Sequence, residues 1–202
     1  GCGEARIMMR RSILAVAVIL CGWLGAQSTS RAEPAVNGII AGSVPILIWS
    51  LFADPPEHRN PDLVTLGGGF FDAVDDEDQA ALFKMEYRSD FFLWRFKPFV
   101  GVDGTSDGGA YAYAGLRVDA YFGRRLVISP NVAPAVYYAG DGKNLGSAGV
   151  LRSGIDVSYR FDNESQLGVG FHHMSHGKVF SDLNPGTETV TVTYSVPMES
   201  LF

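Results

Sequence analysis

From Leu66 to the C-terminus, apolar and polar residues alternate with a period of two, and this pattern constrains the fold more than any other feature of the sequence. Such an alternation gives a β-strand one apolar and one polar face. It recurs in about eight segments, each close to the length of a tilted transmembrane strand and separated from the next by turn residues. The sequence therefore predicts an all-β fold, an eight-stranded antiparallel transmembrane β-barrel. The expected strands cover residues 66–74, 80–88, 96–104, 110–122, 125–138, 150–161, 165–176 and 187–198.

The polar faces of these segments separate a membrane barrel from a soluble β-sandwich. In the last segment Val190, Val192 and Tyr194 share one face, and Thr191 and Thr193 share the other. A soluble sheet turns its polar face to water. A narrow closed barrel encloses that face, so charges of opposite sign can pair inside it. The polar faces here carry both signs, which favours the barrel. Their charged residues are Lys84, Glu86, Arg88, Arg117, Asp119, Arg152, Asp156 and Arg160.

Composition excludes several other classes of protein. The chain is 47% hydrophobic and 19% charged, which excludes an intrinsically disordered protein. Two Cys in 202 residues exclude a disulfide scaffold. A net charge of -6 argues against a nucleic-acid partner, which would require a basic surface. A soluble, Gly-rich secreted β-sandwich stays open as the alternative to the barrel.

The N-terminal region is expected to be a targeting sequence rather than part of the fold. Residues 9–11 form a short basic stretch, residues 13–24 an apolar run too short to span a bilayer, and Ser30-Arg31-Ala32 a cleavage site. We therefore expect a signal peptide over residues 1–32, with 1–8 as an upstream scar before Met9. Residues 33–64 have no predicted structure, and the barrel is expected over 65–202. Both Cys fall within 1–32.

Loop lengths predict how the barrel sits in the bacterial outer membrane. Residues 123–124 and 162–164 form tight turns, whereas the loops at 139–149 and 177–186 are longer. In outer-membrane barrels the short turns face the periplasm and the longer loops face outside. The end of segment 165–176 and the start of segment 187–198 should therefore lie at the outer-leaflet end. Phe202 at the C-terminus, together with the expected signal peptide, also favours this location.

Three polar residues interrupt the apolar face at that end. His173 and Ser175 continue the face of Leu167 and Val169, and Glu188 precedes Val190 on the neighbouring strand. Polar groups on a lipid-facing wall are costly, so such a cluster suggests a function. Ser175 would be the nucleophile, His173 the general base, and Glu188 the carboxylate that orients the imidazole. The structural alternative places all three in the headgroup zone as ordinary polar residues.

At this point the sequence resembles a known family, the lipid A 3-O-deacylases, which are eight-stranded outer-membrane barrels with a His-x-Ser motif and a later Glu. The resemblance spans about residues 65–198. It implies that His173, Ser175 and Glu188 hydrolyse the ester of the 3-hydroxyacyl chain at the 3-position of lipid A. It implies lipid A or lipopolysaccharide as substrate, and no cofactor. The stretches that carry it are 171–177 (FHHMSHG), 184–188 (NPGTE), 66–69 (LGGG), 86–89 (EYRS), 97–101 (KPFVG), 140–146 (GDGKNLG) and 152–155 (RSGI).

The chain departs from the family directly after the nucleophile. The family has Asn at this position as a candidate oxyanion donor, and this chain has His176. A His can donate a hydrogen bond, but its geometry and protonation differ. Loss of an oxyanion donor lowers a rate by about two to three orders of magnitude. His176 and Gly177 are therefore the candidate oxyanion residues, and weakened activity is an expectation.

Other polar residues are assigned structural roles. His172 has the parity opposite to His173 and is expected in the lumen. No metal site is predicted, because no carboxylate cluster accompanies the His residues at ligand spacing. Asp72 and residues 75–78 form an acidic first outer loop, read as solvated, with contact to divalent cations as the sharper alternative. The rival to the enzyme is a non-catalytic eight-stranded barrel with a structural or binding role.

Overall fold

The computed structural model describes residue 45, residues 61–74 and residues 78–202. The expected signal peptide and most of the segment 33–64 lie outside the described residues. Within the described part of the chain, no helix is long and apolar enough to cross a membrane.

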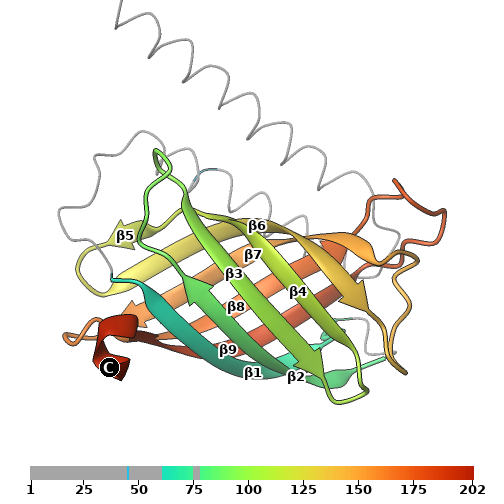
Figure 1. Cartoon of the computed structure of the whole chain (residues 1–202), viewed down its shortest axis with the longest axis horizontal. Helices are drawn as coiled ribbons and strands as arrows, with labels where there is room; N and C mark the ends of the chain where they lie inside the picture. The colour runs from blue at the N-terminus through green and yellow to red at the C-terminus, as the bar shows by residue number, and fades with distance from the viewer. Residues whose placement is uncertain (1–44, 46–60, 75–77) are drawn as a thin grey trace, which may run out of the picture.

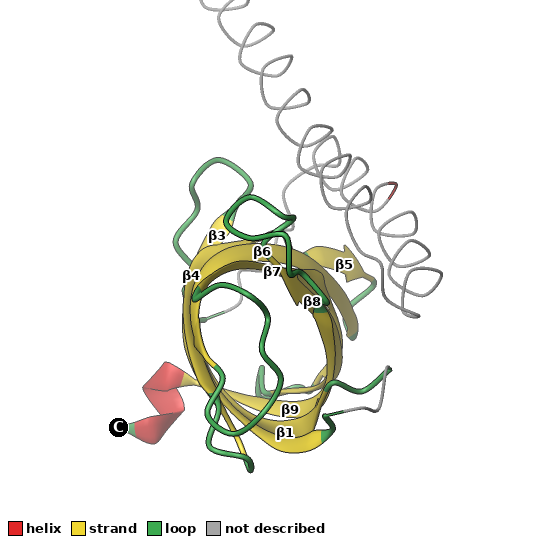
Figure 2. Cartoon of the chain, turned by 90° about the vertical axis from the view of Figure 1, so that its right-hand side faces the viewer, coloured by secondary structure: helices red, strands yellow, loops and turns green. Residues whose placement is uncertain are grey.

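The described chain closes into a ring of antiparallel strands (Figures 1 and 2). The sheet order is β4-β3-β2-β1-β9-β8-β7-β6-β5, and β4 also pairs with β6, which completes the ring. Because β4 and β5 both pair with β6, they act as one interrupted strand, and the closed barrel has eight strands, as predicted. The strands are β1 (Leu63–Phe71), β2 (Ala80–Arg88), β3 (Lys97–Thr105), β4 (Ala110–Arg117), β5 (Ala120–Phe122), β6 (Leu126–Tyr138), β7 (Gly149–Arg160), β8 (Gln166–Ser175) and β9 (Thr187–Pro197). A short 3-10 helix, Met198–Leu201, follows β9.

Two strand boundaries differ from the expected ones for physical reasons. β1 begins and ends three residues before the predicted 66–74. It ends at Phe71 because the next residue, Asp72, adopts a φ of 54°, which an extended strand cannot hold. β4 and β5 are separated at Val118–Asp119, opposite Pro130 of β6. Proline has no N–H to give to the ladder, although the Val118 N–H still donates to the Pro130 carbonyl at 3.0 Å.

The alternating pattern sorts the side chains onto the two surfaces of the barrel as predicted. On β9, Val192 is 56% and Tyr194 47% exposed, whereas Thr191 and Thr193 are buried in the lumen. β2 shows the same alternation, with Phe83 outside and its neighbours Lys84 and Leu82 inside. The outer wall is therefore apolar and the lumen largely polar, the reverse of a soluble protein.

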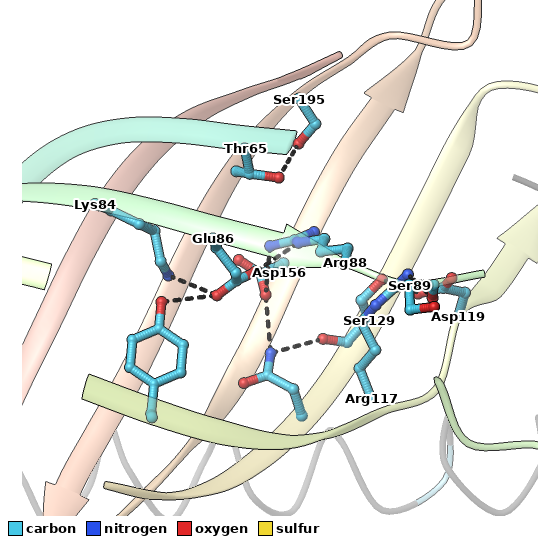
Figure 3. Close-up of polar contacts among 12 residues, drawn as sticks. Thr65, Lys84, Glu86, Arg88, Ser89, Arg117, Asp119, Ser129, Asp156 and Ser195 are labelled. Atoms are coloured by element: carbon cyan, nitrogen blue, oxygen red, sulfur yellow. Dashed lines mark hydrogen bonds and ion pairs between the residues drawn. The ribbon is translucent and has the colours of Figure 1, made fainter. Parts of the chain in front are cut away.

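The predicted charges of both signs do pair inside the barrel (Figure 3). Arg88 Nε donates to Glu86 Oε1 at 2.6 Å, and Arg88 Nη2 lies 3.3 Å from Asp156 Oδ2. Asn131 Nδ2 donates to the same Asp156 oxygen at 2.8 Å, and Tyr113 OH donates to Glu86 Oε2 at 2.8 Å. The buried ion pair of Arg88 with Asp156 thus links β2 to β7, two strands that are not neighbours in the sheet.

An apolar cluster fills the lumen toward one end. It includes Phe71, Tyr137, Leu145 and Met174, all buried, and the rings of Phe71 and Tyr137 stack with centroids 6.0 Å apart. Leu145 comes from the connection between β6 and β7, so that loop folds over the mouth of the barrel. Figure 2 looks at this end and shows loops crossing the opening.

β1 and β9 close the barrel along the glycine run at 67–69. A Cβ at Gly69 would lie 1.9 Å from the Val190 carbonyl oxygen, so only glycine fits there. At Gly67 and Gly69 the two terminal strands therefore approach closely, within a ladder that runs from Leu63↔Pro197 to Phe71↔Thr189.

The two ends of the barrel differ as predicted from loop lengths. One end carries the turns 123–125 and 161–165, the connection 89–96 and both termini of the barrel. The other end carries the connections 72–79, 106–109, 139–148 and 176–186. β8 ends and β9 begins at this second end, which lies at the right of Figure 1.

Candidate active site

The β8–β9 hairpin brings the three predicted catalytic residues to one region of the outer wall. The strands pair so that His173 lies directly opposite Glu188. Both residues share the face of Leu167, Val169 and Val192, which are each about half exposed on the outside of the barrel. Ser175 lies two residues beyond His173 on the same face. The predicted convergence of these residues therefore follows from strand register alone.

His173 and Glu188 form a buried pair. His173 Nδ1 lies 2.8 Å from Glu188 Oε1, and the two residues are 5% and 0% exposed. With Nδ1–H donated to the carboxylate, Nε2 keeps its lone pair and is free to accept a proton. Within the described part of the chain, Glu188 Oε2 has no hydrogen-bond partner. A buried carboxylate held this sparingly is costly for stability, which is typical of a functional position.

Ser175 is the third member of the cluster. Its side chain is partly exposed, and Leu151 of β7 is its partner across the ladder. Among the described residues no hydrogen bond joins Ser175 to His173. Catalytic hydrogen bonds are often long before substrate binds and tighten in the complex. Ser153 of β7 lies opposite His173, so the imidazole has a serine on the strand at its other side as well.

His176 fastens the loop that follows β8. Its Nε2 lies 2.8 Å from the Leu183 carbonyl oxygen, and its backbone N–H donates to Asn184 Oδ1 at 3.1 Å. Since a carbonyl can only accept, the ring donates its Nε2–H to Leu183. Both N–H groups are therefore already engaged. Gly177, with a φ of 58°, makes the turn directly after His176.

His172 points into the lumen, as predicted. It is fully buried, and its Nε2 lies 3.4 Å from Asp156 Oδ2 within the charged network. Its position separates it from His173, although the two are neighbours in sequence. Across the described residues there is no group of three or more His, Cys, Asp or Glu placed to hold a metal ion.

Gly186 is a site residue that sequence reasoning missed. It precedes β9 with a φ of 69°, and a Cβ there would lie 2.9 Å from His173 Cε1. The peptide backbone thus packs on the imidazole. The signal was present in the sequence, because Asn184-Pro185-Gly186 is turn chemistry two residues before Glu188.

Gly186→Ala is expected to lower turnover by about a hundredfold while leaving the barrel folded. The added methyl group would strain the positive φ and push the ring away from its productive position, and a misplacement of about 1 Å can cost that much. Turnover of purified protein on lipid A in mixed micelles, the substrate that the sequence resemblance implies, measures it. Gly123→Ala, at a positive φ in the opposite turn with nothing within 4 Å of its Cβ, is the control for backbone strain. Equal losses in both variants would contradict the role of Gly186.

The closed barrel, with its apolar outer wall and charged lumen, defines the class: this is an outer-membrane β-barrel of the kind found in bacteria. The family is identified by sequence. The model of the family described as lipid A 3-O-deacylase (PagL) matches residues 80–197, more than half of the chain. The chain therefore belongs to the lipid A 3-O-deacylase family, and the resemblance predicted from its motifs is confirmed. No curated protein matches the sequence.

A solved structure with a TM-score above 0.5 supports the fold, and two further structures are given for their similarity alone. The crystal structure of the outer membrane enzyme PagL is 17% identical with a TM-score of 0.53, and the match covers 67% of this chain and 99% of that one. A de novo designed transmembrane β-barrel is 10% identical with a TM-score of 0.48, covering 70% of this chain and 98% of that one. Neisserial surface protein A is 11% identical with a TM-score of 0.48, covering 68% and 97%.

Proposed function

We propose that this chain is an outer-membrane serine esterase that removes the ester-linked 3-hydroxyacyl chain from the 3-position of lipid A. Ser175 is the nucleophile, His173 the general base and Glu188 the orienting carboxylate. The observation that carries the proposal is the His173–Glu188 hydrogen bond of 2.8 Å, buried on the outer wall beside Ser175. Membership in a family of lipid A deacylases supports the substrate class.

The first half-reaction transfers the acyl chain to the protein. His173 Nε2 accepts the proton of the Ser175 hydroxyl while Oγ attacks the ester carbonyl carbon. The tetrahedral intermediate then expels the glucosamine 3-oxygen, which takes the proton from His173. Glu188 stabilises the imidazolium that forms in between, and because Nδ1 is bound to the carboxylate, only Nε2 exchanges protons with the substrate.

The second half-reaction regenerates the protein with water. His173 Nε2 takes one proton from water, the hydroxide attacks the acyl carbonyl, and the Ser175 oxygen leaves with the proton returned from His173. The products are a free 3-hydroxy fatty acid and lipid A with a hydroxyl group at its 3-position. No cofactor takes part in these steps, in which each bond formed and broken is accounted for by ester and water.

The oxyanion of the intermediate requires N–H donors near Ser175. The backbone N–H of Gly177 is the candidate donor that we favour. His176 is the other candidate, although its backbone N–H and its Nε2–H are already engaged with Asn184 and Leu183. This assignment explains why a His can stand where the family has Asn, at the expense of a slower reaction.

The site belongs in the outer leaflet. It lies at the end of the barrel that carries the longer loops, and these face outside in outer-membrane barrels. On the outer wall, His173 and Ser175 would meet an ester whose acyl chain runs beside the strands. The exposed apolar side chains Val179, Phe180 and Leu183 of the following loop suit such a substrate.

Mass spectrometry of lipid A tests the proposal. Cells that express the chain should lose one 3-hydroxyacyl mass from lipid A, and cells that express Ser175→Ala should not, because no other group forms the acyl ester. Ser200→Ala, at an exposed position in the short helix after β9 at the opposite end of the barrel, is the matched control and should retain activity. Equal loss with Ser175→Ala would contradict the assignment and direct attention to Ser153. No loss with any inserted variant would favour the non-catalytic barrel.

A further inference from the structure

A second carboxylate, Asp72, is buried on the chain segment next to Glu188. Asp72 follows the last residue of β1 and is fully buried, with a φ of 54°. Asp and Asn adopt this left-handed conformation more readily than other residues with a side chain. The sequence suggested a solvated acidic loop here, and Asp72 is not part of such a surface. A buried carboxylate requires partners to offset its lost hydration.

Its partners come from another connection at the same barrel end, from the start of β9 and from its own connection. Lys143 Nζ, from the 139–148 connection, lies 2.6 Å from Asp72 Oδ1, and both side chains are at least nine-tenths buried. Thr187 Oγ1 donates to the same oxygen at 3.2 Å. The backbone N–H of Asp78 donates to Oδ2 at 3.2 Å. Asp72 therefore ties the first residue of β9 to the loop that folds over the lumen.

These bonds reach the catalytic carboxylate through the backbone. Thr187 directly precedes Glu188, and the N–H of Ala73 donates to the Glu188 carbonyl at 2.9 Å. The Glu188 peptide is thus fixed on one side by the residue after Asp72 and on the other by a residue that Asp72 binds. Because the Glu188 side chain makes one hydrogen bond to the described residues, with His173, its orientation depends on how its backbone is held.

We propose that Asp72, through its ion pair with Lys143 and its bond to Thr187, is a positioning residue that holds Glu188 against His173. It touches no substrate. The mechanistic meaning of this assignment rests on the proposed function, but the geometric effect on the His173–Glu188 hydrogen bond does not.

Asp72→Asn is the informative variant, because Asn keeps the shape and tolerates the same φ while removing the charge that binds Lys143. Lys143→Met removes the partner and keeps a long side chain. Asp141→Asn, an exposed carboxylate of the same loop as Lys143, is the matched control for loss of one charge. Migration on SDS gels before and after boiling checks that each variant is folded.

The first readout is proton NMR of protein labelled with 15N-histidine in detergent micelles, which needs no substrate. The Nδ1–H of His173 should give a downfield signal, assigned by its absence in His173→Ala. In Asp72→Asn and in Lys143→Met this signal should broaden or move upfield, and in Asp141→Asn it should not change. An unchanged signal in both folded variants would overturn the proposal. If Asp72→Asn does not fold, Lys143→Met decides.

The second readout is turnover on lipid A. Asp72→Asn should lower kcat about tenfold and leave KM within about twofold, because a misaligned base slows chemistry without changing lipid binding. The double variant with Lys143→Met should be no slower than either single one, since each single substitution already removes the Asp72–Lys143 ion pair. Additive losses would overturn the shared role. If the wild type proves inactive, the proposed function fails while the NMR result still judges Asp72.

Discussion

Glu188→Gln is expected to lower kcat by about 10⁴. An amide can turn its NH2 group toward His173 Nδ1, which would favour the tautomer with the proton on Nε2. That nitrogen could then no longer accept the proton of Ser175. A buried carboxylate of a Ser-His-acid triad has this order of effect when it is changed to its amide. Hydrolysis of lipid A by the purified variant, followed over hours, measures it.

The matched control is Glu164→Gln in the turn at the opposite end of the barrel. Glu164 is partly exposed and pairs with Arg160 at 2.7 Å, so the substitution removes the same charge far from the site. Its activity should equal that of the wild type. If Glu188→Gln retained more than about a tenth of the activity, Glu188 would be a headgroup-zone polar residue, as the structural alternative holds.

Asp156→Ala is expected to destabilise the barrel by about 3–5 kcal/mol, the second large effect. Asp156 contacts Arg88 (Figure 3), Asn131 and His172 in the lumen, at 3.3, 2.8 and 3.4 Å. Removing one partner of a buried pair leaves the other charge without compensation, which accounts for this magnitude. Urea unfolding in lipid vesicles, followed by tryptophan fluorescence, provides the free energy of unfolding.

Asp162→Ala separates this effect from the loss of any aspartate. Asp162 pairs with Arg125 at 2.7 Å, but its side chain is 78% exposed. Exposed pairs contribute about 0–1 kcal/mol, so the variant should unfold almost like the wild type. If Asp156→Ala lowered the free energy of unfolding by less than about 1 kcal/mol, water would have replaced its carboxylate. The lumen network would then contribute little to stability.

Much of the fold could be predicted because the outer face of a barrel wall meets lipid and the inner face a polar lumen, so the two faces require different side chains. Val192 must face lipid and Thr191 the lumen, and this requirement fixes strand phase over the whole of β9. The same phase placed His173, Ser175 and Glu188 together without any knowledge of side-chain contacts. The break between β4 and β5 was also readable in principle, because Pro130 cannot donate to its partner strand.

The remainder of the site depends on loops, where no periodicity operates. Nothing in the pattern shows that His176 donates to Leu183, seven residues away, or that Asp72 reaches Lys143 across 71 residues. Such contacts depend on the conformation of whole connections, which are set by tertiary packing rather than by local preference. From the sequence, Asp72 was therefore interpreted as part of a solvated acidic loop, whereas in the structure it is buried.

Because His173 and Glu188 lie on the outer wall, the relevant concentration of a substrate is its concentration within the membrane. Under the proposed function, a substrate would arrive by lateral diffusion within one leaflet, and its supply would be set by its mole fraction in that leaflet rather than by any amount per volume. Diluting lipid A with inert phospholipid would then slow the reaction at constant total lipid, whereas adding buffer would not. Substrate would not pass through the packed lumen, so the charged residues of the lumen would contribute to stability alone.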